Sequence, residues 1–86
     1  MDLQEFIDNF AAEFDETPAE AFTPFTEYKT LEEWNSLTAL SIIAMIDDSY
    51  NKTITGANLR ENKTIEDLFN YVASLGSLSR RYGRAR

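Results

Sequence analysis

The chain has 86 residues, the length of one small domain, and leaves no room for a second hydrophobic core. Apolar residues make up 43% and aromatic residues 13%, too much for a disordered chain. Cysteine and histidine are both absent. Their absence excludes disulfide bonds, thiolate nucleophiles, metal sites built from thiolate or imidazole, and a histidine general base.

The net charge is −7, and its distribution is uneven. Residues 1–50 carry twelve acids and a single base, Lys29, whereas residues 51–86 carry three acids and seven bases. The acidic balance disfavours nucleic acid as a partner and favours a basic protein. No apolar run approaches the ~20 residues of a membrane span, and the acidic start is unlike a signal peptide. We therefore expect a cytoplasmic protein, and we expect it to be a monomer.

Residues 3–14 show the clearest helical periodicity. The apolar positions follow the i, i+3, i+4, i+7 spacing of one helix face: Leu3, Phe6, Ile7, Phe10, Ala11 and Phe14. Asp2 is the expected N-cap, with Glu5 three residues later. Thr17 and Pro18 should close this helix.

Residues 17–33 contain both prolines and are predicted to form a long loop. Four large side chains in it would be costly to leave in water, so the loop should lie on the core. They are Phe22, Phe25, Tyr28 and Leu31.

Two further helices and a short helical turn are predicted downstream. One helix runs from about Ser36 to Ser49 or Tyr50 and is capped by Asn35 or Ser36. After a loop over 51–56, a turn is expected around 57–61. The last helix is capped by Thr64, with Asp67 in the capping-box position, and is ended by Gly76. The fold class is thus all-α: a small three-to-four-helix bundle in residues 1–76, followed by a basic tail, residues 77–86.

The middle helix carries more apolar residues than one buried face needs. On a wheel of about 100° per residue, the core face consists of Ala39, Ile42, Ile43, Ile46 and Tyr50. The remaining arc holds Thr38, Ser41, Met45, Asp48 and Ser49. A second apolar strip, Leu37, Leu40 and Ala44, is bracketed by Asp47 and Asp48. Periodicity alone favours burial of this strip, and the alternative is an exposed docking surface.

Ser36 has two interpretations from the residues alone. It can cap the helix, or its hydroxyl can accept a group attached by another enzyme. The residues disfavour a self-contained serine hydrolase, because no histidine is present to activate the hydroxyl and Lys29 is not at a recognised dyad spacing.

The segment from Glu33 to Tyr50 reads EWNSLTALSIIAMIDDSY and resembles acyl carrier proteins. The signature of that family is Asp-Ser-Leu at the start of a helix that ends in acids and an aromatic residue. The similarity continues through Ile54 and resumes in TIEDLFNYV, residues 64–72, so that it covers about residues 2–75 by motif order and spacing.

The resemblance implies that Ser36, with Asn35 and Leu37 as motif neighbours, carries a 4′-phosphopantetheine arm. A phosphopantetheinyl transferase attaches this arm from coenzyme A, and its terminal thiol holds acyl groups as thioesters. The chain would then be a carrier rather than an enzyme, serving fatty-acid, polyketide or related biosynthesis. An imported thiol would also explain how a chain without cysteine takes part in thioester chemistry.

The resemblance also assigns two surfaces. The docking residues for ketosynthases, acyltransferases or ligases with basic patches become Leu37, Leu40, Ala44, Asp47 and Asp48. An interior between the middle and last helices would accept the acyl chain, lined by Ile43, Ile46, Ile54, Leu59, Ile65, Leu68 and Phe69; these residues fit an ordinary core equally well.

Three positions depart from the family pattern. Asn35 stands where the motif has aspartate, and Thr38 and Ser41 stand where fatty-acid carriers often have acids. Trp34 either pins the loop to the core or contacts a partner. These departures favour a specialised carrier, an aminoacyl or peptidyl carrier, or an unmodified interaction module of the same fold.

Overall fold

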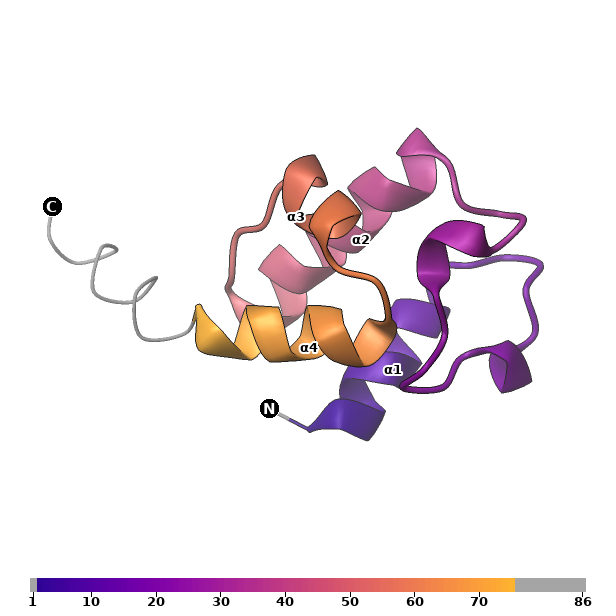
Figure 1. Cartoon of the computed structure of the whole chain (residues 1–86), viewed down its shortest axis with the longest axis horizontal. Coiled ribbons are helices and arrows are strands. Elements are labelled where there is room, and N and C mark those ends of the chain that lie inside the picture. The colour runs from indigo at the N-terminus through magenta and orange to yellow at the C-terminus, as the bar shows by residue number, and fades with distance from the viewer. Residues whose placement is uncertain (1, 76–86) are drawn as a thin grey trace, which may run out of the picture.

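Four α-helices make up most of residues 2–75, the part of the chain that the computed structural model describes. They are α1 (Leu3–Ala11), α2 (Ser36–Tyr50), α3 (Gly56–Glu61) and α4 (Ile65–Ser74). Within this range there is no strand, and one isolated antiparallel bridge joins Glu27 to Thr64. The predicted all-α bundle with a long first loop is confirmed (Figure 1). No helix among residues 2–75 is long and apolar enough to cross a membrane. Gly76 and the predicted basic tail lie outside the described residues.

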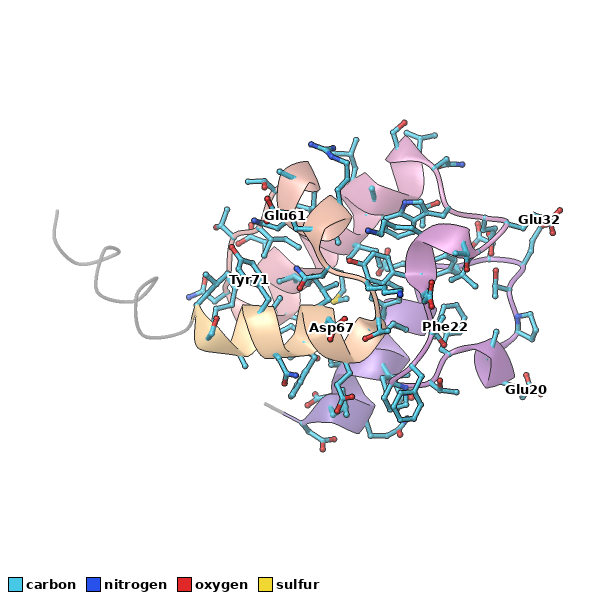
Figure 2. The ribbon with its side chains drawn as sticks, viewed as in Figure 1. Glu20, Phe22, Glu32, Glu61, Asp67 and Tyr71 are labelled. Atoms are coloured by element: carbon cyan, nitrogen blue, oxygen red, sulfur yellow. The ribbon has the colours of Figure 1, made fainter. Side chains whose placement is uncertain are left out.

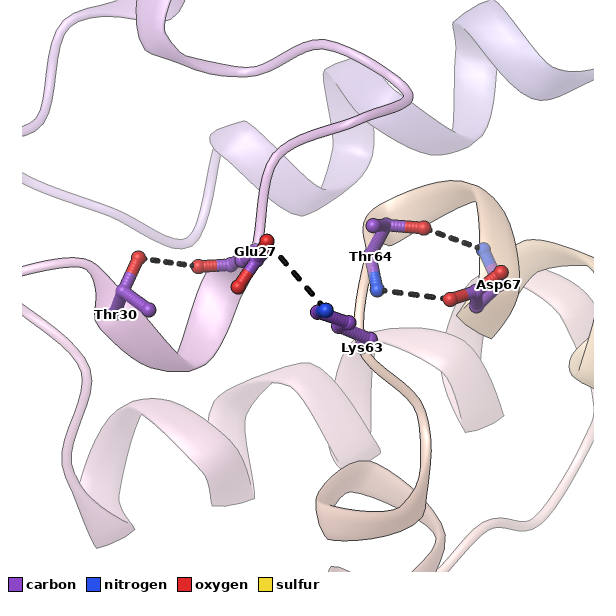
Figure 3. Close-up of polar contacts among 5 residues, drawn as sticks. All are labelled: Glu27, Thr30, Lys63, Thr64 and Asp67. Carbon is purple, nitrogen blue, oxygen red and sulfur yellow. Dashed lines mark hydrogen bonds and ion pairs between the residues drawn. The ribbon is translucent and has the colours of Figure 1, made fainter.

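The helices begin at the residues that the capping signals indicate. Asp2 caps α1 by accepting a hydrogen bond from the Glu5 N–H at 3.0 Å. Thr64 and Asp67 form the predicted capping box of α4, with bonds of 3.1 and 3.2 Å (Figure 3). A second capping box, made by Thr55 and Asn58, starts α3. Each box satisfies N–H groups that the first helical turn leaves without a backbone acceptor.

Helix α1 ends at Ala11, three residues before the last residue of its apolar pattern and well before Thr17 and Pro18, which were expected to close it. The Glu13 and Phe14 N–H groups bond to the carbonyls three residues back, so the last turn tightens and the chain leaves the helix. Phe14 nevertheless stays buried because its ring packs at a tilt against Phe22, 5.0 Å away, and stacks on Trp34 at 6.5 Å. The periodicity correctly predicted burial of Phe14 but not its backbone conformation.

An aromatic cluster holds the long loop against α1. Phe10 is fully buried, and its ring centre lies 5.5–6.4 Å from those of Phe6, Phe14, Phe22 and Tyr28. Phe22 points inward from the loop, whereas Glu20 and Glu32 point away from the bundle (Figure 2). The prediction that the loop lies on the core is therefore confirmed for Phe22 and Tyr28 and, in part, for Leu31.

Phe25 is the exception, because 76% of its surface is exposed. It occupies the tip of a turn in which the Thr26 N–H bonds to the Thr23 carbonyl. The chain on both sides of it is tied to the start of α4: the Ile65 N–H donates to the Thr26 carbonyl and the Glu66 N–H to the Pro24 carbonyl. These bonds direct the Phe25 side chain outward, and its predicted burial was wrong.

An exposed ion pair adds little to this junction. Lys63 Nζ lies 3.9 Å from the Glu27 carboxylate, and both side chains are largely exposed (Figure 3). Pairs of this kind contribute about 0–1 kcal/mol. The backbone bonds to α4 therefore fix the loop here.

The buried face of α2 is rotated relative to the predicted one. Ile42 and Ile46 are fully buried as expected, but Met45, assigned to the polar arc, is only 7% exposed. Glu13, in the chain that follows α1, lies on the same side, since Glu13 and Met45 line one surface groove. Ile43 is left half-buried at the edge of the core.

Candidate functional site

Ser36 is the first residue of α2, and Asn35 is its N-cap. The Asn35 side-chain oxygen accepts the Thr38 N–H at 3.0 Å, which decides between the two predicted capping residues. Ser36 is exposed, and its hydroxyl makes no hydrogen bond to another of the described residues. The hydroxyl is therefore accessible to an enzyme that would modify it.

Glu33 fixes the chain that leads into α2. Its carboxylate accepts hydrogen bonds from the Thr17 hydroxyl at 2.6 Å and from the N–H groups of Asp15, Glu16 and Thr17 at 2.8–3.1 Å. The Glu33 carbonyl in turn accepts the Thr38 hydroxyl at 2.8 Å. The loop after α1 and the start of α2 are thereby held together at one side chain, three residues before Ser36.

These bonds should make stability depend on the charge of Glu33 at acid pH. The Thr17 hydroxyl, with the N–H groups, holds the pKa of Glu33 below its ordinary value. Ionised Glu33 makes its full contribution to the free energy of unfolding above the unfolded pKa of about 4.3. This contribution is lost as the pH falls through the folded pKa. In Glu33→Gln, denaturant titrations should show a smaller loss of stability over that interval than in the parent.

Glu32→Gln is the matched control for this prediction. Glu32 is the exposed neighbour, and its carboxylate makes no hydrogen bond to the described residues. An equal change in the pH profile of both variants would show that the Glu33 contacts are not the cause.

Trp34 also holds the segment that leads into α2. Its ring lies 5.1 Å from the Tyr28 ring and 6.5 Å from the Phe14 ring, and it is partly buried. The interpretation that Trp34 anchors the loop to the core is confirmed. Part of its surface also remains open to the pocket described below.

The strip beside Ser36 is exposed. Leu37 is 74% and Leu40 60% exposed, so the burial favoured by periodicity was wrong. The helix turns its other side toward α1 and α3, which leaves this strip in solvent. Together with exposed Ala44, Asp47 and Asp48, these residues form one face of α2, which we call the α2 face. Two exposed leucines bordered by acidic residues are more typical of a docking surface than of an ordinary protein surface.

A pocket of about 480 Å³ opens next to Ser36. It lies between the end of the long loop, the first half of α2 and α3. Its lining is Lys29, Trp34, Asn35, Ser36, Ala39, Leu40, Ile43, Gly56, Leu59 and Arg60. The volume is in the range of small-molecule sites, which are mostly apolar with a few polar groups.

Only two of the seven predicted cavity residues, Ile43 and Leu59, line this pocket. Phe69 is partly buried against the core. The remaining four are packed inside the core: Ile46, Ile54, Ile65 and Leu68.

Five residues of the pocket were absent from the predicted site: Lys29, Trp34, Ala39, Gly56 and Arg60. Lys29 Nζ donates a hydrogen bond to the Arg60 carbonyl, which ties the loop to α3 across 31 positions of sequence. The one available signal was that Lys29 is the single base among the first fifty residues.

The chemistry available around Ser36 is limited. The pocket lining contains no carboxylate, and its titratable side chains are those of Lys29 and Arg60. Within residues 2–75 no three metal-ligating side chains lie close enough to hold a metal ion. The arrangement presents a hydroxyl for modification beside an apolar surface.

Comparisons of the chain with protein-family models, curated proteins and solved structures find no match.

Proposed function

We propose that the chain is a carrier protein whose Ser36 accepts a 4′-phosphopantetheine arm. The observation that carries this proposal is the placement of Ser36: exposed, at the first position of α2, beside an apolar pocket and next to the α2 face. The motif resemblance is the second support. The chain then acts as a cytoplasmic shuttle without catalytic activity of its own.

The proposed arm supplies the thiol that the chain lacks, and the thiol carries acyl groups as thioesters. A long flexible tether raises the effective concentration of its cargo at each partner enzyme. The start of α2 suits a phosphodiester because the dipole of the helix favours negative charge there.

The α2 face is the proposed docking surface for the transferase and for cargo enzymes. Leu37 and Leu40 supply apolar contact area, while Asp47 and Asp48 attract basic patches. Exposed charges of this kind act chiefly on the association rate and on orientation.

The proposal is tested by incubating the chain with coenzyme A and a broad-specificity phosphopantetheinyl transferase. Intact mass should rise by about 340 Da in the parent and in Ser49→Ala, a control at the other end of α2. Ser36→Ala should show no increase. An unmodified parent, under conditions that convert a known carrier completely, would contradict the proposal.

Asn35→Asp should raise the rate of this modification about tenfold, because it restores the negative charge that the motif has beside the serine. The carboxylate can still accept the Thr38 N–H, so the free energy of unfolding should change by less than about 0.5 kcal/mol. The rate is measured by mass at early times, with stability from denaturant titration. An unchanged or slower rate in Asn35→Asp would show that a negative charge beside the serine does not assist the transferase.

A second candidate function follows from Asn35 itself. An amide in place of the motif carboxylate fits a carrier-like domain that binds partners through the α2 face and is never modified. In that case Ser36→Ala keeps both partner binding and cellular function, whereas Leu40→Glu on the α2 face removes them.

A further inference from the structure

The pocket beside Ser36 differs in charge from two other surface grooves of the described chain. Its lining includes two bases and no acid. The groove near the end of α2 is lined by Glu13, Asp47 and Asp48, and a third groove by Glu16, Glu32 and Glu33, with no base in either. On a chain of net charge −7, positive charge is therefore concentrated at the one apolar pocket among these three.

The two bases lie at the pocket wall. Lys29 Nζ is fixed by its bond to the Arg60 carbonyl and lies 6.0 Å from the centre of the Tyr28 ring. The Arg60 guanidinium folds back over Gly56, where its Nη1 would stand 3.5 Å from a Cβ. Among residues 2–75, no carboxylate lies within 4.0 Å of either base. Both cations can therefore take an external anion without first breaking an ion pair.

The rest of the wall is apolar. Trp34, Ile43 and Leu59 form the inner surface, and exposed Leu40 forms the outer lip. An apolar wall next to two cations is complementary to a ligand with an apolar body and an anionic end. Arginine in particular suits a carboxylate, which its planar head group binds through two parallel hydrogen bonds.

We propose that this pocket binds an acyl chain of medium length that ends in a free carboxylate. Resting on the proposed function, the cargo on Ser36 is then the half-thioester of a dicarboxylic acid, folded back into the pocket beside its own attachment point. The arm's phosphodiester is the other possible source of an anion for these cations. The start of α2 can bind the phosphodiester. Lys29 and Arg60 come from the loop and from α3, on another wall of the pocket.

The test uses the unmodified chain, which carries neither arm nor phosphate. Trp34 is its single tryptophan and lines the pocket, so its fluorescence reports binding directly. The two probes are monomethyl suberate and dimethyl suberate, which share one chain and differ by one charge. The monoanion should bind about tenfold more tightly than the neutral diester. The preference should fall to about twofold or less in Lys29→Met and in Arg60→Gln.

Two variants distinguish the loss of a pocket cation from a folding defect. Arg60→Gln keeps the backbone carbonyl that Lys29 uses, and Lys63→Met removes an exposed cation outside the pocket and should leave the preference unchanged. Helical circular dichroism confirms the fold of each variant.

Equal binding of the two esters, binding of neither, or a preference that survives in both pocket variants would overturn the proposal. So would inorganic phosphate displacing monomethyl suberate at equal concentration, because the cations would then be a site for the phosphodiester. None of these measurements involves the transferase, so their failure is separate from failure of Ser36 modification.

Discussion

Phe10→Ala should lower the free energy of unfolding by about 3–5 kcal/mol, the cost of truncating a buried phenylalanine. Phe10 is fully buried at the centre of the aromatic cluster, where its ring packs against Phe6 of α1 and against Phe22 and Tyr28 of the long loop. Removing it opens a cavity between these two segments and loses the packing that holds Phe22 and Tyr28. For a small domain this is a large share of a total stability of about 5–15 kcal/mol.

Phe25→Ala is the matched control, since it removes the same atoms from a ring that is 76% exposed. Its effect should stay within about 0.5 kcal/mol. Urea titrations followed by circular dichroism measure both variants. Similar losses for Phe10→Ala and Phe25→Ala would show that the loop is not held by the cluster.

Tyr28→Phe should cost about 1–3 kcal/mol although it removes a single oxygen atom. The Tyr28 hydroxyl lies 2.6 Å from the Leu59 carbonyl and 3.1 Å from the Asn62 carbonyl, at the end of α3. Carbonyls at a helix end have no partner within the helix, so this hydroxyl satisfies them. Burial, together with the negative charge of Asp67, raises the pKa of Tyr28 above its ordinary value, which keeps the hydroxyl a donor.

The control for this change is Tyr71→Phe on α4. The Tyr71 side chain is half-buried and makes no hydrogen bond to the described residues, so its variant should stay within about 0.5 kcal/mol of the parent. Amide hydrogen exchange should also show faster exchange in α3 of Tyr28→Phe alone. Exchange that speeds up uniformly, or not at all, would contradict a specific role for this hydroxyl at α3.

Features set by neighbouring residues could be predicted from the sequence. Helix α4 is the clearest case, because Thr64 and Asp67 form its capping box and its apolar residues keep one spacing throughout. The start of α1 at Asp2 and the start of α2 beside Ser36 follow from local capping as well.

Features set by distant contacts could not be predicted in the same way. Phe14 follows the helical spacing of α1 but is buried by Phe22 and Trp34 outside the helix. Helix α2 carries apolar residues on more than one side, so spacing alone does not show that Met45 faces inward and Leu37 outward. Their directions depend on where α1 lies.

The candidate site shows the same difference between features set by neighbouring residues and features set by distant contacts. The motif drew attention to Ser36 and the α2 face, which are continuous in sequence. The pocket was missed because its walls come from three segments that meet only in the fold, as the bond between Lys29 and Arg60 illustrates. Only the isolated charge of Lys29 in an acidic half pointed toward it.

The most direct test of the central claim is the intact mass of the protein purified from the cells that produce it. The account predicts a mass about 340 Da or more above that of the bare chain, with the addition mapped to the peptide that contains Ser36 and removed in Ser36→Ala. Protein that is active in its cells with Ser36 entirely unmodified would contradict the account.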